Sequence, residues 1–109
     1  MEPTVNALLL KLGRPQYSAD RGQLLWPCPL TQEQAAEVAP QLMARLECQL
    51  GALEQGADRL FWPARFEDTV LGLQFEALCD SLWLEASDGA LDGAETLAFL
   101  AAQVGAEHV

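Results

Sequence analysis

The sequence predicts an α+β protein: a two-layer sandwich in which a long central helix and a C-terminal helix pack on one face of a mainly antiparallel sheet. Residues 59–87 alternate apolar and polar side chains in three short runs separated by turn residues, which is typical of a β-meander. Residues 31–54 and 93–103 instead place apolar side chains at spacings of three and four, which is typical of helices packed on a sheet. The chain has 109 residues, half of them hydrophobic, so we expect a single domain over residues 1–109.

The N-terminal third contains one ambiguous element and one clear element. Residues 4–12 fit a short helix and a short strand almost equally well. Residues 16–27 predict a β-hairpin, with residues 20–22 as its turn. Pro27 and Pro29 end the second arm, because proline cannot donate a backbone hydrogen bond.

The longest predicted helix covers residues 31 to about 54. Thr31 is a good N-cap, and Gln34 completes a capping box. Pro40 conflicts with a continuous helix, so we expect a kink or a break near Ala39. The apolar stripe along this helix consists of Ala35, Val38, Leu42, Leu46, Leu50 and Leu53.

In the meander, alternate side chains face the helices and the side chains between them face away. Trp83 and Phe61 fall in the outward set, together with Arg59 and Arg65, and Pro63 indicates an edge strand or a bulge. The inward set consists of Leu60, Trp62, Ala64, Phe66, Leu71, Leu73, Phe75, Ala77, Leu82, Leu84 and Ala86.

The C-terminal segment predicts a helix over residues 93–103. Asp92 is its expected cap, and Glu95 stands at the third helical position, as in a capping box. Gly105 is its expected end. We expect residues 106–109 to fray.

Charge is unevenly distributed along the chain. The net charge is −10, and residues 66–109 hold nine acidic residues and no lysine or arginine. Nucleic acids and anionic membranes are disfavoured as partners, because proteins bind both by neutralising their negative charge. We therefore expect no nucleic-acid and no membrane partner, whereas a protein partner is permitted.

Cysteine usage indicates a reducing compartment. Cys28, Cys48 and Cys79 are odd in number and lack metal-binding spacing, so we expect free thiols, as in the cytosol. Cys48 reads as a core or boundary residue, and Cys28, between two prolines, is a candidate for exposure. The N-terminus lacks the basic region and cleavage site of a signal peptide, so we expect a cytoplasmic protein.

Few residues are suited to metal binding or catalysis. Asp88, Asp92 and Glu95 lie close together, but their spacing does not match a calcium loop, and a turn followed by a helix cap explains them. His108 stands at the end of the chain without a partner at metal or triad spacing. Cys79 has an aspartate as its neighbour, which disfavours a thiolate. We expect no cofactor, no metal, no catalytic residue and no enzyme activity.

Trp83 is the strongest candidate for a binding residue. Strand alternation places it on the face away from the helices, with Phe61, and an exposed aromatic patch on a sheet often marks an interface. We predict Trp83, Phe61 and Trp62 as contact residues. Two alternatives remain open: the N-terminal segment covers Trp83, or the register differs by one residue, which exchanges the two faces.

The second half of the chain resembles a family of small bacterial proteins of unknown function. The resemblance rests on the pattern L-x-F-E…D-S-L-W-L-E, which is residues 73–85 here, and on the final helix GAETLAFLAAQV. It implies a compact α+β domain and brings no catalytic residues. The size and the low pI are also similar to those of the acidic chaperones of type III secretion, although that class has strands where residues 31–54 predict a helix.

The function predicted from the sequence is a non-enzymatic, adaptor-like cytosolic protein that binds another protein, with a homodimer as the expected form. A secretion chaperone is the alternative among binding proteins. A different alternative is a small-ligand or carboxylate-only enzyme site between sheet and helix.

Overall fold

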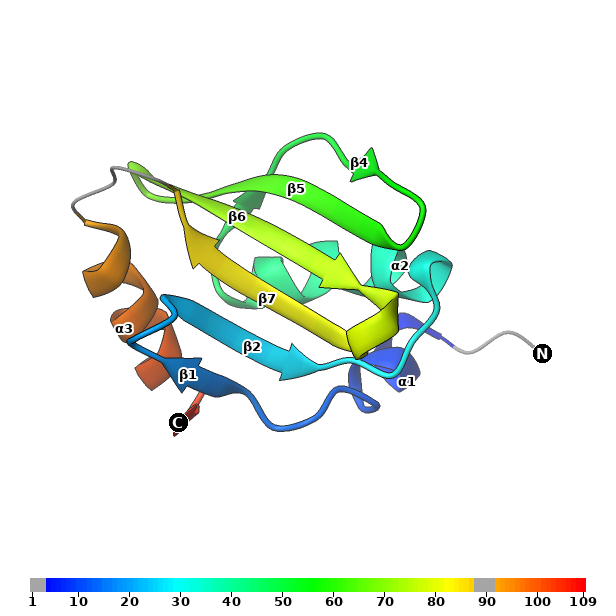
Figure 1. The fold of residues 1–109 in the computed structure, drawn as a ribbon, viewed down its shortest axis with the longest axis horizontal. Coiled ribbons are helices and arrows are strands. Elements are labelled where there is room, and N and C mark those ends of the chain that lie inside the picture. Colours follow the sequence, from blue (N-terminus) through cyan, green and yellow to red (C-terminus); the bar gives the residue numbers. More distant parts are fainter. Residues whose placement is uncertain (1–3, 88–91) are drawn as a thin grey trace.

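The computed structural model describes residues 4–87 and 92–109, and they form an α+β fold (Figure 1). The described strands make one mixed, mostly antiparallel sheet of eight, in the order β3-β5-β6-β7-β2-β1-β8, with β4 also paired to β5. The helix α2 passes behind the sheet in this view, α1 packs against α2, and α3 packs against β6 and β7. The predicted fold class is confirmed.

The N-terminal part forms a short helix followed by a hairpin. Of the two alternatives for the first segment, the helix is correct: α1 spans Val5–Leu9, and the hydroxyl of Thr4 caps it by accepting from the N–H of Ala7 at 3.2 Å. The predicted hairpin is confirmed, with β1 (Gln16–Ser18) antiparallel to β2 (Gln23–Pro27).

The helix α2 (Gln32–Arg45) begins as predicted. The hydroxyl of Thr31 accepts from the N–H of Gln34 at 3.1 Å, and the Gln34 side chain accepts from the N–H of Thr31 at 3.2 Å. The predicted break near Ala39 does not occur, because α2 continues through Pro40. Pro40 is exposed, so its ring meets solvent rather than the core.

The predicted end of this helix near residue 54 is wrong, because α2 ends at Arg45. Glu47 takes the left-handed conformation, with φ at 59°, and its N–H donates to the carbonyl of Ala44 at 3.1 Å. The N–H of Cys48 donates to the carbonyl of Met43 at 2.9 Å. These two bonds form a Schellman motif with glutamate in the place that glycine usually takes.

Two short strands replace the second half of the predicted helix. β3 (Gln49–Leu50) and β4 (Glu54–Gln55) both pair antiparallel with β5. Leu53, the last residue of the predicted stripe, is exposed in the loop between them. The apolar spacing therefore continued beyond the residues that are helical.

The meander is confirmed as β5 (Arg59–Phe66), β6 (Thr69–Glu76) and β7 (Ser81–Ala86). Ala77 does not extend β6 but begins the single turn η1 (Ala77–Cys79). The expected edge strand or bulge at Pro63 is wrong, because β5 pairs with β3 and β4 on one side and in regular register with β6 on the other. Pro63 falls between the two short strands, where its carbonyl accepts from the N–H of Gly51 at 2.7 Å. The N–H that proline lacks would point to the same side, so the ladder with β6 loses no bond.

The C-terminal helix α3 (Gly93–Gln103) has the predicted bounds, and Gly105 follows it with φ at 65°. The predicted side-chain cap is absent, because Asp92 precedes α3 without a capping bond. Fraying of residues 106–109 is also a wrong prediction, since β8 (Glu107–His108) pairs parallel with β1. Asp88, in the rejected calcium loop, lies outside the described residues.

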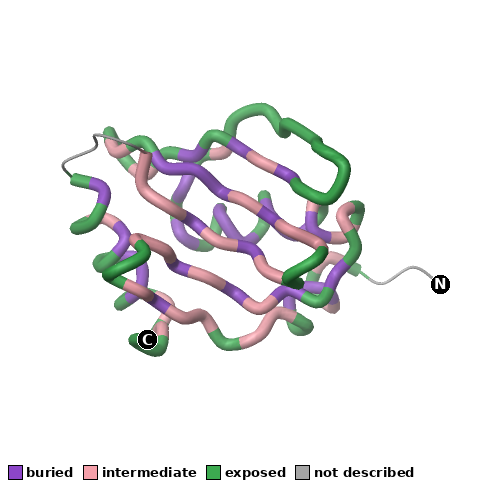
Figure 2. Tube along the Cα trace, in the orientation of Figure 1, coloured by how far each residue is buried: buried purple, intermediate pink, exposed green. Residues whose placement is uncertain are grey.

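One core lies between the sheet and the helices. Phe75, Trp26 and Trp62 are its large strand residues, and Leu97 and Met43 come from the helices. Figure 2 shows buried residues alternating with partly exposed ones along β2 and β7. The sheet therefore has a buried face and a second face that no described helix covers, which we call the open face.

Candidate protein interface

The open face follows from the strand register, because residues opposite each other on neighbouring strands share a face. Most of its side chains come from β1, β2, β5, β6 and β7, and the two-residue strands β3, β4 and β8 add Gln49, Glu54 and Glu107 at its edges. Those of the five longer strands are Gln16, Ser18, Gln23, Leu25, Pro27, Arg59, Phe61, Pro63, Arg65, Val70, Gly72, Gln74, Glu76, Ser81, Trp83 and Glu85.

One row of the open face crosses all five of these strands. In order, Gln16, Leu25, Trp83, Gln74 and Phe61 are paired directly from strand to strand. None of the five is charged, and three are large and apolar. At about 4.8 Å between strands, the row spans roughly 20 Å of the sheet.

The ring of Phe61 lies over Gly72 on the next strand. A Cβ atom added to Gly72 would lie 2.9 Å from Cε2 of Phe61, which is closer than side chains tolerate. Glycine thus creates the depression in which the ring rests. A ring held in this way loses little conformational freedom when a partner covers it, which favours binding.

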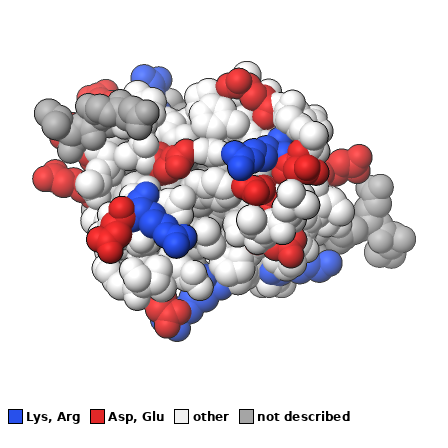
Figure 3. Space-filling model, viewed as in Figure 1, with Lys and Arg blue, Asp and Glu red and all other residues white. Residues whose placement is uncertain are grey.

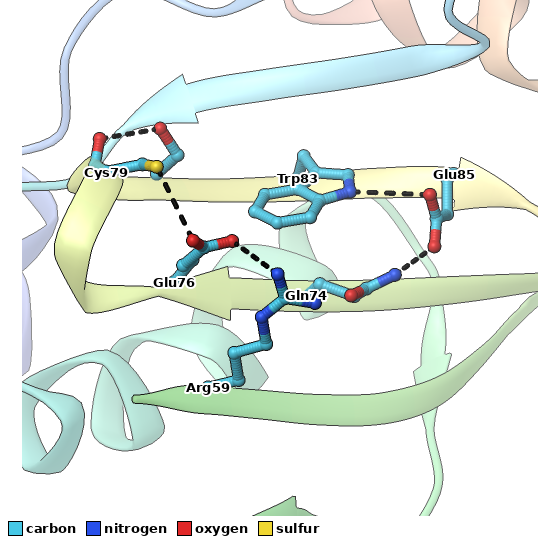
Figure 4. Close-up of polar contacts among 7 residues, drawn as sticks. Arg59, Gln74, Glu76, Cys79, Trp83 and Glu85 are labelled. Atoms are coloured by element: carbon cyan, nitrogen blue, oxygen red, sulfur yellow. Dashed lines mark hydrogen bonds and ion pairs between the residues drawn. The ribbon is translucent and has the colours of Figure 1, made fainter. Parts of the chain in front are cut away.

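The indole of Trp83 is also held in place (Figure 4). Its Nε1–H donates to Oε2 of Glu85 at 3.4 Å, and the side-chain amide of Gln74 donates to Oε1 of the same carboxylate. The donor of the indole is therefore paired while its ring remains partly exposed. Both hydrogen-bond donors to Glu85 are neutral groups, so they do not balance the negative charge of its carboxylate.

A second polar group lies at one end of the open face. Arg59 pairs with Glu76, with 3.2 Å between Nη2 and Oε2, and the thiol of Cys79 donates to Oε1 of Glu76 at 3.5 Å. This bond to Glu76, more than any other cause, raises the pKa of the Cys79 thiol above its usual value. A protonated thiol is a poor nucleophile.

The other two thiols are buried and face the core. Burial raises the pKa of Cys28 to about 11 and that of Cys48 to about 11. The expected exposure of Cys28 is wrong, because its side chain is fully buried in the core. The assignment of Cys48 to the core is confirmed.

The three predicted contact residues do not share one environment. Trp83 and Phe61 are on the open face, one on each side of Gln74. Trp62 points the opposite way into the core and is only 4% exposed, so it cannot contact a partner. Both alternatives to an outward Trp83 are therefore wrong. The predicted register is correct, and α1 packs against α2 rather than over Trp83.

Sequence reasoning missed Leu25 as a member of this surface, whereas strand alternation correctly predicts that Gln74 and Glu85 face outward. Leu25 lies on the outward face of β2: it is half-buried, whereas its two neighbours on the strand are buried. Its contact with the Trp83 row depends on the pairing of β2 with β7, which are far apart in the sequence. The sequence contains no local signal for that pairing.

Charges of both signs lie side by side on this face (Figure 3). Over β1, β2, β5, β6 and β7, Arg59 and Arg65 balance Glu76 and Glu85, so the centre of this face is neutral although the chain carries −10. Glu54 and Glu107 make its two edges acidic. A neutral region on an acidic protein is one that another acidic chain can approach with little repulsion.

A separate groove lies on the helical side, between α2, α3 and the β5–β6 turn. Its volume is about 510 Å³. The rings of Phe66 and Phe99 lie 5.7 Å apart in it, and Arg45, Glu47 and Glu67 supply its charges. Its size and mixed lining suit a small ligand.

Within residues 4–87 and 92–109, no group of three or more His, Cys, Asp or Glu is placed to hold a metal ion. None of the helices in those residues combines the length and the apolar character needed to cross a bilayer. His108 instead contacts Tyr17 edge-on, with ring centroids 5.4 Å apart.

Comparison with known proteins places the chain in a family. The model of a family described as "Protein of unknown function (DUF3630)" matches residues 12–105. The chain belongs to the DUF3630 family. The match covers most of the chain rather than only the second half, and the DUF3630 region includes the five longer strands of the open face but not α1 or β8. No curated protein and no solved structure shows a significant match.

Proposed function

We propose that this protein is a non-enzymatic, self-associating domain of the cytosol that binds protein through the open face. The observation that carries the proposal is the uncharged row across five strands, with Trp83 and Phe61 on the two sides of Gln74. Aromatic residues with a satisfied polar group and a fixed ring are the side chains that most often dominate protein interfaces.

The test is native mass spectrometry of the tagged protein, purified gently from its own cells. Wild type is expected to carry a second polypeptide, either another copy or a different protein. Trp83→Ala is expected to lose it while keeping the wild-type circular dichroism spectrum. Leu10→Ala is the matched control, because Leu10 is 86% exposed on α1, away from the open face.

Two results would count against this proposal. Retention of the same polypeptide by Trp83→Ala would place the contact elsewhere. Unfolding of Trp83→Ala would show that the residue serves stability, and Phe61→Ala would then provide the remaining test of the surface.

A second candidate function is small-ligand binding in the groove between α2 and α3. The exposed ring of Phe99, which is 50% exposed beside Phe66, favours it. A bound small molecule in the native mass spectrum, lost in Phe99→Ala but kept in Trp83→Ala, would support this function over the first.

A further inference from the structure

The aromatic row of the open face is symmetric about β6. Gln74 on β6 pairs with Phe61 on β5 and with Trp83 on β7. The two aromatic residues therefore lie on opposite sides of Gln74, each one strand away from it. Any operation that exchanges β5 and β7 therefore exchanges an aromatic residue for another aromatic residue. A surface of this kind is suited to meet its own copy.

We infer that two copies of this chain pack open face to open face, with a two-fold axis running along β6 above Gln74. The inference rests on the proposed function and names its partner as a second copy. Rotation about this axis places Trp83 of each copy over Phe61 of the other. Two sheets in this arrangement lie ~10 Å apart with their strands nearly aligned, as in a β-sandwich.

The same rotation brings opposite charges together. Glu85 is level with Gly72 and Pro63 in the register, and Arg65 lies two residues beyond Pro63 on β5. Exchange of β5 and β7 places Pro63 of one copy opposite Glu85 of the other, and Arg65 lies about 7 Å further along the strand, a distance that its long side chain can span. Covering Glu85 would otherwise leave a desolvated carboxylate without a counter-charge, which is unfavourable. Arg59 is less suited to this role, because it already pairs with Glu76.

The size of the contact is that of a weak, concentration-dependent dimer. About an axis on β6, the copies overlap over β2, β5, β6 and β7, whose 27 residues give a flat footprint of roughly 450 Å² at about 4.8 Å by 3.4 Å for each residue. That is smaller than the ~800 Å² that each partner buries in a standard interface and falls in the range of transient contacts. The neutral centre of the face, over β5, β6 and β7, permits close approach of two chains that each carry −10.

Charge reversal tests the arrangement. Arg65→Glu alone and Glu85→Arg alone each create two like-charge contacts across the two-fold axis, so each variant is expected to dimerise at least ~10-fold more weakly than wild type. An equimolar mixture of the two variants makes two complementary contacts and is expected to recover the dimer in sedimentation velocity. Arg45→Glu and Glu37→Arg apply the same charge changes on the helical side and are expected to leave dimerisation unchanged.

Chemical cross-linking gives a second test that does not alter Glu85. Gln74 lies beside the proposed axis, so Gln74→Cys in a Cys79→Ala background is expected to cross-link to its own copy through a short bismaleimide. Glu37→Cys in the same background is expected to remain uncross-linked.

The outcomes separate this inference from the proposed function. If Trp83→Ala abolishes dimerisation but the charge-reversed mixture stays monomeric and Gln74→Cys does not cross-link, the two-fold arrangement is wrong and the open face still binds protein. A wild-type monomer at every concentration overturns the inference, and the proposed function then survives only if a different protein is captured in a Trp83-dependent way. If substitutions at Trp83, Arg65 and Glu85 all leave dimerisation unchanged, both the two-fold arrangement and the proposed function of the open face are overturned.

Discussion

Phe61 and Trp62 are neighbours on β5, yet they lie in opposite environments. Trp62 is 4% exposed and packs with the core between sheet and helices, whereas Phe61 rests on Gly72 in partial contact with solvent. The same contrast holds between Trp26 and Leu25 on β2. Both faces of the sheet thus carry large apolar side chains, but the described helices cover only one. The buried face therefore accounts for folding, and the open face is available for a partner.

The largest effect is expected on the buried face. Trp62→Ala removes a core side chain and leaves a cavity, which typically costs about 3–5 kcal/mol. That is a large part of the roughly 5–15 kcal/mol that stabilises a domain. Urea denaturation is expected to show a strongly lowered midpoint or an unfolded chain. A loss below about 1 kcal/mol would contradict the assignment of Trp62 to the core.

The next effect is expected on the open face. Trp83→Ala is expected to weaken self-association by about 2 kcal/mol or more, which is close to 30-fold in Kd, because buried aromatic anchors dominate interfaces. The free energy of unfolding of the monomer is expected to fall by less than about 1 kcal/mol, as for a cross-strand pair. Sedimentation equilibrium measures the first quantity, and urea denaturation of dilute protein measures the second. The reverse pattern, with lost stability and unchanged association, would exchange the roles of the two faces.

A smaller effect is expected where Phe61 meets Gly72. Gly72→Ala introduces a Cβ only 2.9 Å from the ring, so the ring must shift, at a cost of about 1–3 kcal/mol for overpacking. Phe61→Ala removes the clash, and the double variant is expected to be more stable than the sum of the two single changes predicts. Strict additivity in urea denaturation would show that the ring does not rest on the glycine.

The smallest effect concerns the thiols and pH. The pKa values of Cys28 and Cys48 are raised by burial to about 11 from an ordinary value of 9.0, so folding favours the protonated form. Their contribution to stability is fully present below pH 9 and is lost as the pH rises towards 11. In native protein at pH 8, a thiol reagent is expected to modify only the exposed Cys79. Rapid modification of all three would contradict the burial of the other two.

Local patterns predicted much of this fold. Alternation gave the three long strands and the two faces, and the pair Thr31 and Gln34 gave the start of α2, because these signals act between residues close in the sequence. The end of α2 could not be predicted in the same way. The apolar stripe continues to Leu53, and the left-handed residue that stops the helix is Glu47 rather than a glycine.

Long-range pairing was beyond the sequence patterns. The parallel pair of β8 with β1 and the antiparallel pair of β2 with β7 each join segments that are distant in the chain, and neither leaves a local signal. Trp83 and Phe61 were accessible as interface candidates through strand alternation alone. Their arrangement around Gln74, and the support of Phe61 by Gly72, required the registers of β5, β6 and β7.

The most direct test of an open-face contact is acrylamide quenching of tryptophan fluorescence across a dilution series. Trp26 and Trp62 are each 4% exposed, so Trp83 is the tryptophan that the quencher reaches most readily. If two copies cover the open face, quenching is expected to be strong in dilute protein and to fall as concentration drives association. Equal quenching at all concentrations, in protein that sedimentation shows to be associated, would contradict the account, because the open face would then remain exposed in the assembly.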